Sequence, residues 1–179
     1  MKNIVLTGMS GAGKSTVGKL LSEKLNMAFI DTDDCIRQYA GKTLQDILDQ
    51  DGIDRFLEIE ETVVSALSAS NTVIATGGSV IYSERAMTAL KKNGVIVYLY
   101  LPFDVLAKRI PDTSSRGIVM RHGSTLHDVY NERMPLYKKY CDIFIDRTAS
   151  SKAKSAQAII AAVSSLFYHG QAEDRQEAQ

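Results

Sequence analysis

The segment that most constrains how this 179-residue chain can fold occupies residues 8–15 and has the sequence GMSGAGKS. It matches the pattern GxxxxGK[ST] at every specified position, directly after an apolar run and directly before residues with helical periodicity. Glycines let consecutive backbone N–H groups turn inward, and the N-terminus of the following helix adds partial positive charge. The segment therefore predicts a strand, a phosphate-binding loop and a helix, in that order.

The two residues that end this loop indicate how a bound nucleotide is held. In loops of this kind the lysine reaches the β- and γ-phosphates, and the hydroxyl that follows it binds magnesium. We therefore expect Lys14 and Ser15 to hold ATP and Mg²⁺, in a cradle completed by Gly11, Ala12, Gly13 and Thr16. A glycine-rich turn without a ligand is the alternative, and the complete match disfavours it. A dinucleotide-binding turn is excluded, because the pattern GxGxxG does not occur here.

The rest of the chain predicts the fold class α/β. Helical patterns separate four further apolar runs, which indicate strands at residues 27–30, 72–75, 95–101 and 142–145. Strands that alternate with helices indicate a parallel sheet of about five strands, flanked by helices on both faces as three layers. We expect a single domain over residues 1–169 and a polar, disordered tail at 170–179. Residues 110–124 show no period, so we expect a mobile lid there.

Composition excludes some classes of partner. The formal net charge is zero and no basic block occurs, so binding to nucleic acid or to an anionic membrane is not indicated. No apolar run approaches the roughly 20 residues of a membrane-spanning helix. The two cysteines form no CxxC motif, and no secretory leader precedes the first strand, so we expect a cytoplasmic protein with free thiols. We expect its partner to be a small-molecule acceptor and the protein to be a monomer.

Two pairs of residues follow predicted strands at the edge of the sheet where ligands bind. Asp31 and Asp33 can divide labour, one toward magnesium or its waters and the other toward an acceptor hydroxyl. Capping of the next helix by Thr32 or Asp33 is the alternative. Gly77 and Gly78 allow the backbone to approach a ligand closely, and an ordinary turn is the alternative.

A basic residue in the helix predicted at residues 126–140 is a further candidate. Arg133 precedes Pro135, which should kink or interrupt that helix. A guanidinium at this point can clamp a carboxylate or a transferring phosphate, and a surface position is the alternative. The absence of an NKxD motif disfavours a GTPase. The phosphate-binding loop together with Asp31, Asp33 and Arg133 therefore favours a kinase.

The combined pattern resembles shikimate kinase, within the nucleoside-monophosphate-kinase-like P-loop kinases. The resemblance spans about residues 3–168 and rests on motifs in family order, namely GMSGAGKST at 8–16, FIDTD at 29–33, DG…F…E at 51–61, ATGGS at 75–79, a lid arginine at 116 and ERMPLY at 132–137. It implies a P-loop kinase fold and transfer of the γ-phosphoryl group of ATP, with Mg²⁺, to shikimate. The product is then shikimate 3-phosphate, in aromatic amino acid biosynthesis.

The resemblance also implies roles for the acceptor-side residues. Asp31 lies near magnesium through water, and Asp33 holds the acceptor hydroxyls and is the candidate base. Gly77 and Gly78 contact the substrate through their backbone, and Arg133 pairs with the substrate carboxylate.

On the nucleotide side, the resemblance implies three contributions from basic residues. Lys14 and Arg116 neutralise phosphate charge during transfer, the second of them entering from the lid. Arg109 stacks on adenine and helps to bind the nucleotide.

Three departures from the family pattern lie on the acceptor side and the lid. Family members have an arginine after the phenylalanine of the motif helix, where this chain has Leu57. Arg55 lies two positions away, on a different side of a helix, and is not expected to replace it. The third glycine of the GGG run is Ser79, and Gly117 stands where proline is common. Losing one partner of a desolvated charge pair costs on the order of 2–5 kcal/mol.

These departures support a second hypothesis, a kinase with a different small hydroxy acid, polyol or amino-acid alcohol as acceptor. A third hypothesis is an inactive relative that only binds nucleotide. The intact nucleotide side and the pair Asp31 and Asp33 argue against the third.

Overall fold

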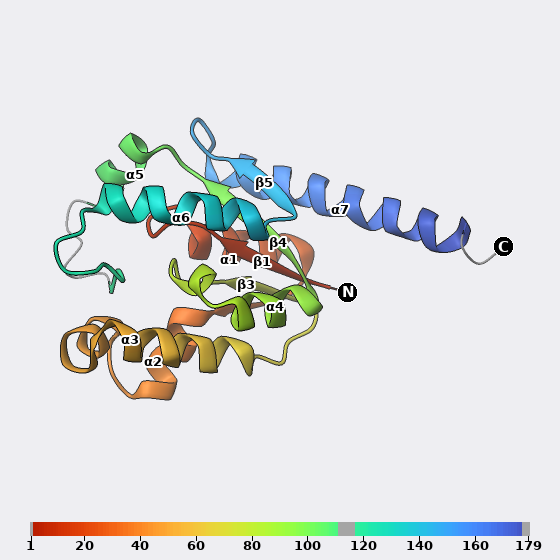
Figure 1. Ribbon diagram of the computed structural model, residues 1–179. Helices are drawn as coiled ribbons and strands as arrows, with labels where there is room; N and C mark the ends of the chain where they lie inside the picture. The colour runs from red at the N-terminus through yellow and green to blue at the C-terminus, as the bar shows by residue number, and fades with distance from the viewer. Residues whose placement is uncertain (1, 111–116, 177–179) are drawn as a thin grey trace.

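The computed structural model describes residues 2–110 and 117–176, in which five parallel strands form one sheet in the order β2-β3-β1-β4-β5 (Figure 1). The predicted fold class is confirmed. The strands are β1 Asn3–Thr7, β2 Ala28–Asp31, β3 Thr72–Ala75, β4 Gly94–Tyr100 and β5 Ile143–Asp146. The helices are α1 Lys14–Leu25, α2 Thr32–Ala40, α3 Leu44–Ser65, the short 3-10 helix η1 Val80–Tyr82, α4 Glu84–Lys92, α5 Phe103–Arg109, α6 Leu126–Tyr140 and α7 Lys152–Gln176.

Helices cover both faces of the sheet. Helices α1 and α7 pack against each other on one face, and α4 and α6 lie over the other (Figure 1). The central strand β1 is buried along its whole length, because it pairs with β3 on one side and β4 on the other. Parallel pairing brings the carboxyl ends of β1, β2 and β3 to one edge of the sheet, where the polar motifs follow them.

The first position of the turn after β1 has room only for glycine. Gly8 has φ +138°, and a Cβ atom there would lie 2.6 Å from the carbonyl oxygen of Leu99. Gly13, the N-cap of α1, is also left-handed, with φ 88°. These two glycines let the chain turn back sharply from the central strand into α1.

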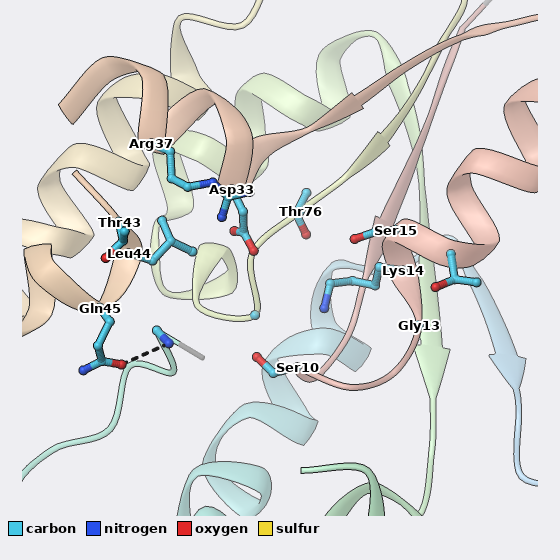
Figure 2. A pocket seen from close by; sticks show the side chains of 13 residues that line it. Ser10, Gly13, Lys14, Ser15, Asp33, Arg37, Thr43, Leu44, Gln45 and Thr76 are labelled. Carbon is cyan, nitrogen blue, oxygen red and sulfur yellow. Dashed lines mark hydrogen bonds between the residues drawn. The ribbon is translucent and has the colours of Figure 1, made fainter. Parts of the chain in front are cut away.

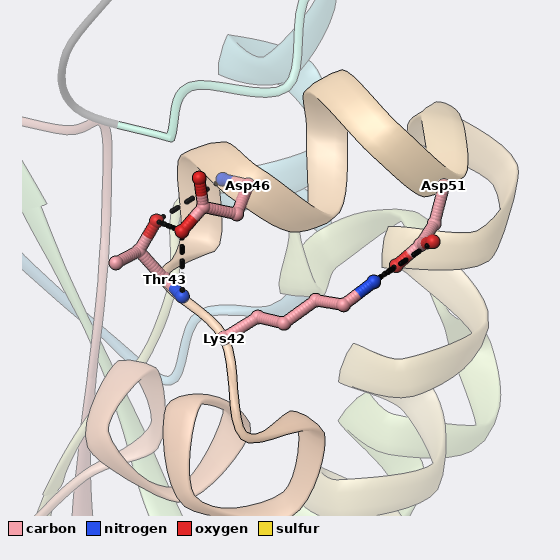
Figure 3. A network of polar contacts seen from close by, with 4 residues as sticks. All are labelled: Lys42, Thr43, Asp46 and Asp51. Atoms are coloured by element: carbon pink, nitrogen blue, oxygen red, sulfur yellow. Dashed lines mark hydrogen bonds and ion pairs between the residues drawn. The ribbon is translucent and has the colours of Figure 1, made fainter.

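A polar network fixes the turn between α2 and α3 (Figure 3). Thr43 Oγ1 accepts from the Asp46 N–H at 3.1 Å, and Asp46 Oδ2 accepts from the Thr43 N–H at 3.3 Å, so the two residues form the capping box of α3. Lys42 pairs with Asp51 at 2.8 Å. The turn thereby holds the start of α3 in place, and α3 is then interrupted at Gly52, with φ 83°.

Some elements differ from the sequence prediction. Helix α6 runs through Pro135 without ending, because its buried face, which includes Tyr130, Arg133 and Tyr137, holds it against the body. Helix α5 has no counterpart in the prediction. Helix α7 extends to Gln176, beyond the predicted boundary at residue 169. Within the described residues, no helix is both long enough and apolar enough to cross a bilayer.

Candidate functional site

The phosphate-binding loop surrounds a buried lysine. Lys14 Nζ donates to the carbonyl oxygens of Gly8 at 2.7 Å and Met9 at 3.0 Å. Burial lowers the pKa of this ammonium group to about 8, although Asp33 and Asp31 act in the opposite direction. The side chain lies at the wall of a cavity of about 590 Å³, which Asp33 also lines (Figure 2). The loop thus holds one buried cation at the wall of this cavity.

Oxygen atoms from two motifs meet beside this lysine. Ser15 Oγ donates to Asp31 Oδ2 at 2.6 Å, and Asp31 Oδ1 accepts from the Asp33 N–H at 3.1 Å, which caps α2. Hydroxyl and carboxylate oxygens are ligands that Mg²⁺ prefers, and Mg²⁺ usually keeps several waters and substrate phosphates in its shell. The described residues contain no group of three or more acids, histidines or cysteines that could enclose a metal. The donor set fits a magnesium ion shared with a nucleotide.

Asp33 lines the same cavity from the first turn of α2 (Figure 2). Burial and the nearby Asp31 raise its pKa, whereas Lys14 lowers it. The backbone N–H of Gly77 donates to Thr32 Oγ1 at 3.0 Å, which joins the turn after β3 to the start of α2. Asp33 and Gly77 therefore stand together, as the sequence motifs suggested.

The glycines after β3 are closely surrounded. A Cβ atom on Gly77 would collide with Glu60 Oε1 and lie 3.1 Å from Asp33 Oδ1. On Gly78 it would lie 3.1 Å from Arg133 Nη1. Side chains at these two positions would fill the space in front of the acid and the arginine.

Arg133 is buried, with 1% of its surface exposed, so the surface alternative is wrong. Its Nε–H donates to Tyr82 Oη at 3.1 Å, and its Nη2 donates to the carbonyl oxygen of Val119 at 2.6 Å. Tyr137 Oη donates to the Gly78 carbonyl oxygen at 2.6 Å, which fixes the turn that Arg133 faces. A fully charged guanidinium is therefore held next to Gly78.

A buried acid on α3 escaped the sequence analysis. Glu58, Glu60 and Glu61 together suggest a solvated helical face, but Glu60 is only 2% exposed. Its Oε1 has no hydrogen-bond partner. Burial raises its pKa to about 7, with a smaller opposing effect from the Ser79 hydroxyl. A buried carboxyl group thus lies close enough to Asp33 and Arg133 to interact electrostatically with both.

Leu57 lies near this acid but adds no charge. It is half-buried and packs on the smaller core cluster formed largely by α2 and α3. Arg55 pairs with Glu58 at 2.9 Å on the exposed face, so it does not replace an arginine at position 57. Among the described residues, the basic side chain nearest to Gly78 is Arg133, which is buried.

Two arginines contact the outside of the phosphate-binding loop. Arg109 Nη1 donates to the Gly11 carbonyl oxygen at 3.4 Å. Arg147, which the sequence analysis missed, is 5% exposed, donates from Nε to Ser155 Oγ at 2.8 Å and from Nη1 to the Ala12 carbonyl oxygen. The remaining predicted site residue, Arg116, lies outside the described residues.

Comparisons with known proteins identify the family that this chain matches. Residues 10–164 match the family described as shikimate kinase. The shikimate kinase of Caldicellulosiruptor bescii is 39% identical over 164 residues, covering 89% of this chain and 94% of that protein. The shikimate kinase of Thermodesulfovibrio yellowstonii is 36% identical, with the same coverage of 89% and 94%.

Solved structures give the same result. Shikimate kinase from Acinetobacter baumannii in complex with shikimate has a TM-score of 0.85 and 32% identity, covering 92% of this chain and 94% of that one. Shikimate kinase from Aquifex aeolicus has a TM-score of 0.78 and 31% identity, covering 90% and 96%. A gluconokinase from Sinorhizobium meliloti, at 18% identity and a TM-score of 0.54 over 96% and 97% of the two chains, shares the fold alone.

Proposed function

The chain belongs to the shikimate kinase family, and from this premise we propose that it transfers the γ-phosphoryl group of ATP to the 3-hydroxyl group of shikimate. The observation that carries the proposal is one cavity lined by Lys14 and Ser15 on the nucleotide side and by Asp33 on the acceptor side. Transfer between two substrates requires that both be held together, in line and away from water.

On the nucleotide side, we assign phosphate binding to Lys14 and to the loop residues Gly11, Ala12, Gly13, Ser15 and Thr16. The Lys14 ammonium group offsets negative charge on the transferring phosphoryl oxygens. Ser15 and Asp31 are the residues that would hold Mg²⁺, which supplies further charge neutralisation on the β- and γ-phosphates when bound. Arg109 is assigned to adenine and Arg116 to the phosphates, as the family resemblance implies.

On the acceptor side, we assign the reacting hydroxyl group to Asp33. Its carboxylate accepts a hydrogen bond from that hydroxyl and takes the proton as the oxygen–phosphorus bond forms. The raised pKa of Asp33 makes it a better base than an ordinary aspartate, for which the value is about 3.9. Gly77 and Gly78 leave room for the ring, and Arg133 pairs with the substrate carboxylate.

An acceptor panel tests this function. Purified protein with ATP and Mg²⁺ should release ADP when shikimate is added, and Lys14→Ala should abolish that release. The methyl ester of shikimate, which lacks the negative charge, should be a poor substrate because Arg133 loses its partner. Equal ADP release with and without shikimate would refute the proposal.

A different hydroxy acid or polyol as acceptor is the second candidate, and Leu57 is the observation that favours it. It is the weaker candidate, since the family match and relatives at 35–39% identity carry the shikimate kinase name. In the same panel, gluconate or another hydroxy acid would then outperform shikimate. The monomeric state and the cytoplasmic location stay predictions.

A further inference from the structure

If the acceptor is shikimate, as proposed above, recognition of its carboxylate depends on how Arg133 is held. Position 57 supplies an apolar side chain, and Arg133 is the buried cation next to Gly78. A lone flexible guanidinium would lose side-chain entropy on each binding event, whereas a fixed one would not. The contacts that fix Arg133 therefore bear directly on affinity for the acceptor.

Tyr82 makes two of these contacts. Its hydroxyl oxygen accepts from Arg133 Nε at 3.1 Å, and the Arg133 Cζ atom lies 5.1 Å from the centre of the tyrosine ring. The second distance is within the range of a cation–π interaction. Together they restrain both the position of the guanidinium and the rotation of its plane.

The third contact engages Nη2, and Nη1 lies beside the turn after β3. Nη2 donates to the Val119 carbonyl oxygen, while Nη1 faces Gly78, 3.1 Å from the point that a Cβ atom there would occupy. With Nε and Nη2 engaged, Nη1 is the nitrogen that is turned toward the turn after β3. The orientation of Arg133 is thus set before an acceptor arrives.

Tyr82 lies close to both Leu57 and Arg133. It lies in η1, directly after the glycine turn, and η1 packs against both α3 and α6. Tyr82 and Leu57 line the same two small cavities, of about 270 and 150 Å³. Burial raises the pKa of the Tyr82 hydroxyl, whereas Arg133 acts in the opposite direction, and the hydroxyl keeps its proton at neutral pH.

We propose that Tyr82 is a positioning residue for acceptor specificity, which holds Arg133 in the carboxylate-binding orientation and so compensates for the uncharged Leu57. Tyr82 does not touch the reacting atoms. Its effect is on the affinity for an acidic acceptor rather than on the rate of transfer. The proposal rests on the function proposed above.

Tyr82→Phe tests this proposal, because it keeps the ring and removes the hydroxyl. A hydrogen bond to a charged group corresponds to about one power of ten in affinity. We expect KM for shikimate to rise about tenfold, with kcat and KM for ATP changed less than about twofold. Tyr39→Phe, on the exposed face of α2 with 60% of Tyr39 exposed, is the matched control and should change none of these values.

Two further readouts separate positioning from a structural effect. Tyr82→Phe should reduce kcat/KM for shikimate but not for its methyl ester, because the ester makes no charge pair with Arg133. Adding Leu57→Arg to Tyr82→Phe should restore KM for shikimate to within about threefold of wild type, since a second cation makes the orientation of Arg133 less important.

The outcomes are distinct. Equal losses with shikimate and its ester, or an unchanged KM for shikimate in Tyr82→Phe, would overturn the positioning role while wild-type activity remains. If the wild-type protein shows no shikimate-dependent ADP release, the proposed function fails and this inference fails with it.

Discussion

Replacing Glu60 by glutamine should stabilise the folded protein, increasingly so as the pH rises from 4.5 to about 7. Burial raises the pKa of this carboxyl group from 4.5 to about 7, so its charged form is disfavoured in the fold. Each pH unit between the two values corresponds to about 1.4 kcal/mol, which gives about 3 kcal/mol in total. A neutral amide of the same shape avoids this cost.

The direction of this pH dependence follows from the number of protons that Glu60 binds in the folded and unfolded states. Between pH 4.5 and about 7 the folded state holds the Glu60 proton and the unfolded state does not. The contribution of Glu60 to stability is therefore fully present below pH 4.5 and is lost as the pH rises to about 7. The stability difference between Glu60→Gln and wild type should grow over this window and then level off.

Urea unfolding at several pH values from 4 to 8.5 measures this difference. Glu58→Gln is the matched control, because Glu58 lies two residues earlier with its side chain 67% exposed. A constant offset between Glu60→Gln and wild type would reflect only how the amide packs. A difference that does not change with pH, or the same pH dependence in Glu58→Gln, would show that burial does not raise the pKa of Glu60.

Three further predictions concern binding. Because the pKa of Lys14 is lowered to about 8, ATP binding should take up a proton above that pH. The Kd for ATP should then rise by up to about tenfold per pH unit. A Kd for ATP that stays constant from pH 7 to 9.5 by calorimetry would contradict this prediction. Gly77→Ala should raise KM for shikimate and lower kcat at least about tenfold, because the new methyl group collides with Glu60 Oε1. An unchanged KM for ATP would show that the defect is confined to the acceptor side of the cavity. Leu57→Arg alone should lower KM for shikimate by supplying a second cation near Glu60, and steady-state kinetics showing a higher KM would favour a different natural acceptor.

Much of the nucleotide side could be predicted from sequence, since its geometry is local. The pattern at residues 8–15 specifies backbone conformation and side-chain type within a single turn, and the structure has Gly13 in the left-handed region and Lys14 over the loop. The acids after β2 were also accessible, because the ends of parallel strands meet at one edge of a sheet. Asp31 and Ser15 are accordingly in contact.

The acceptor side depends on packing between distant segments, which the sequence does not reveal. Glu60 belongs to a row of acids on α3, and only the approach of the turn after β3 makes it buried. Tyr82 and Arg133 are 51 residues apart, and Arg147 contacts Ala12 across 135 residues. Neither pairing produces a motif, so neither could be recognised from spacing.

Phosphorus NMR of the reaction mixture detects transfer of the γ-phosphoryl group from ATP to shikimate. With protein, ATP, Mg²⁺ and shikimate, we expect one new phosphate ester for each ADP formed, and neither product with Lys14→Ala. ADP accompanied only by inorganic phosphate, whether or not shikimate is present, would contradict it.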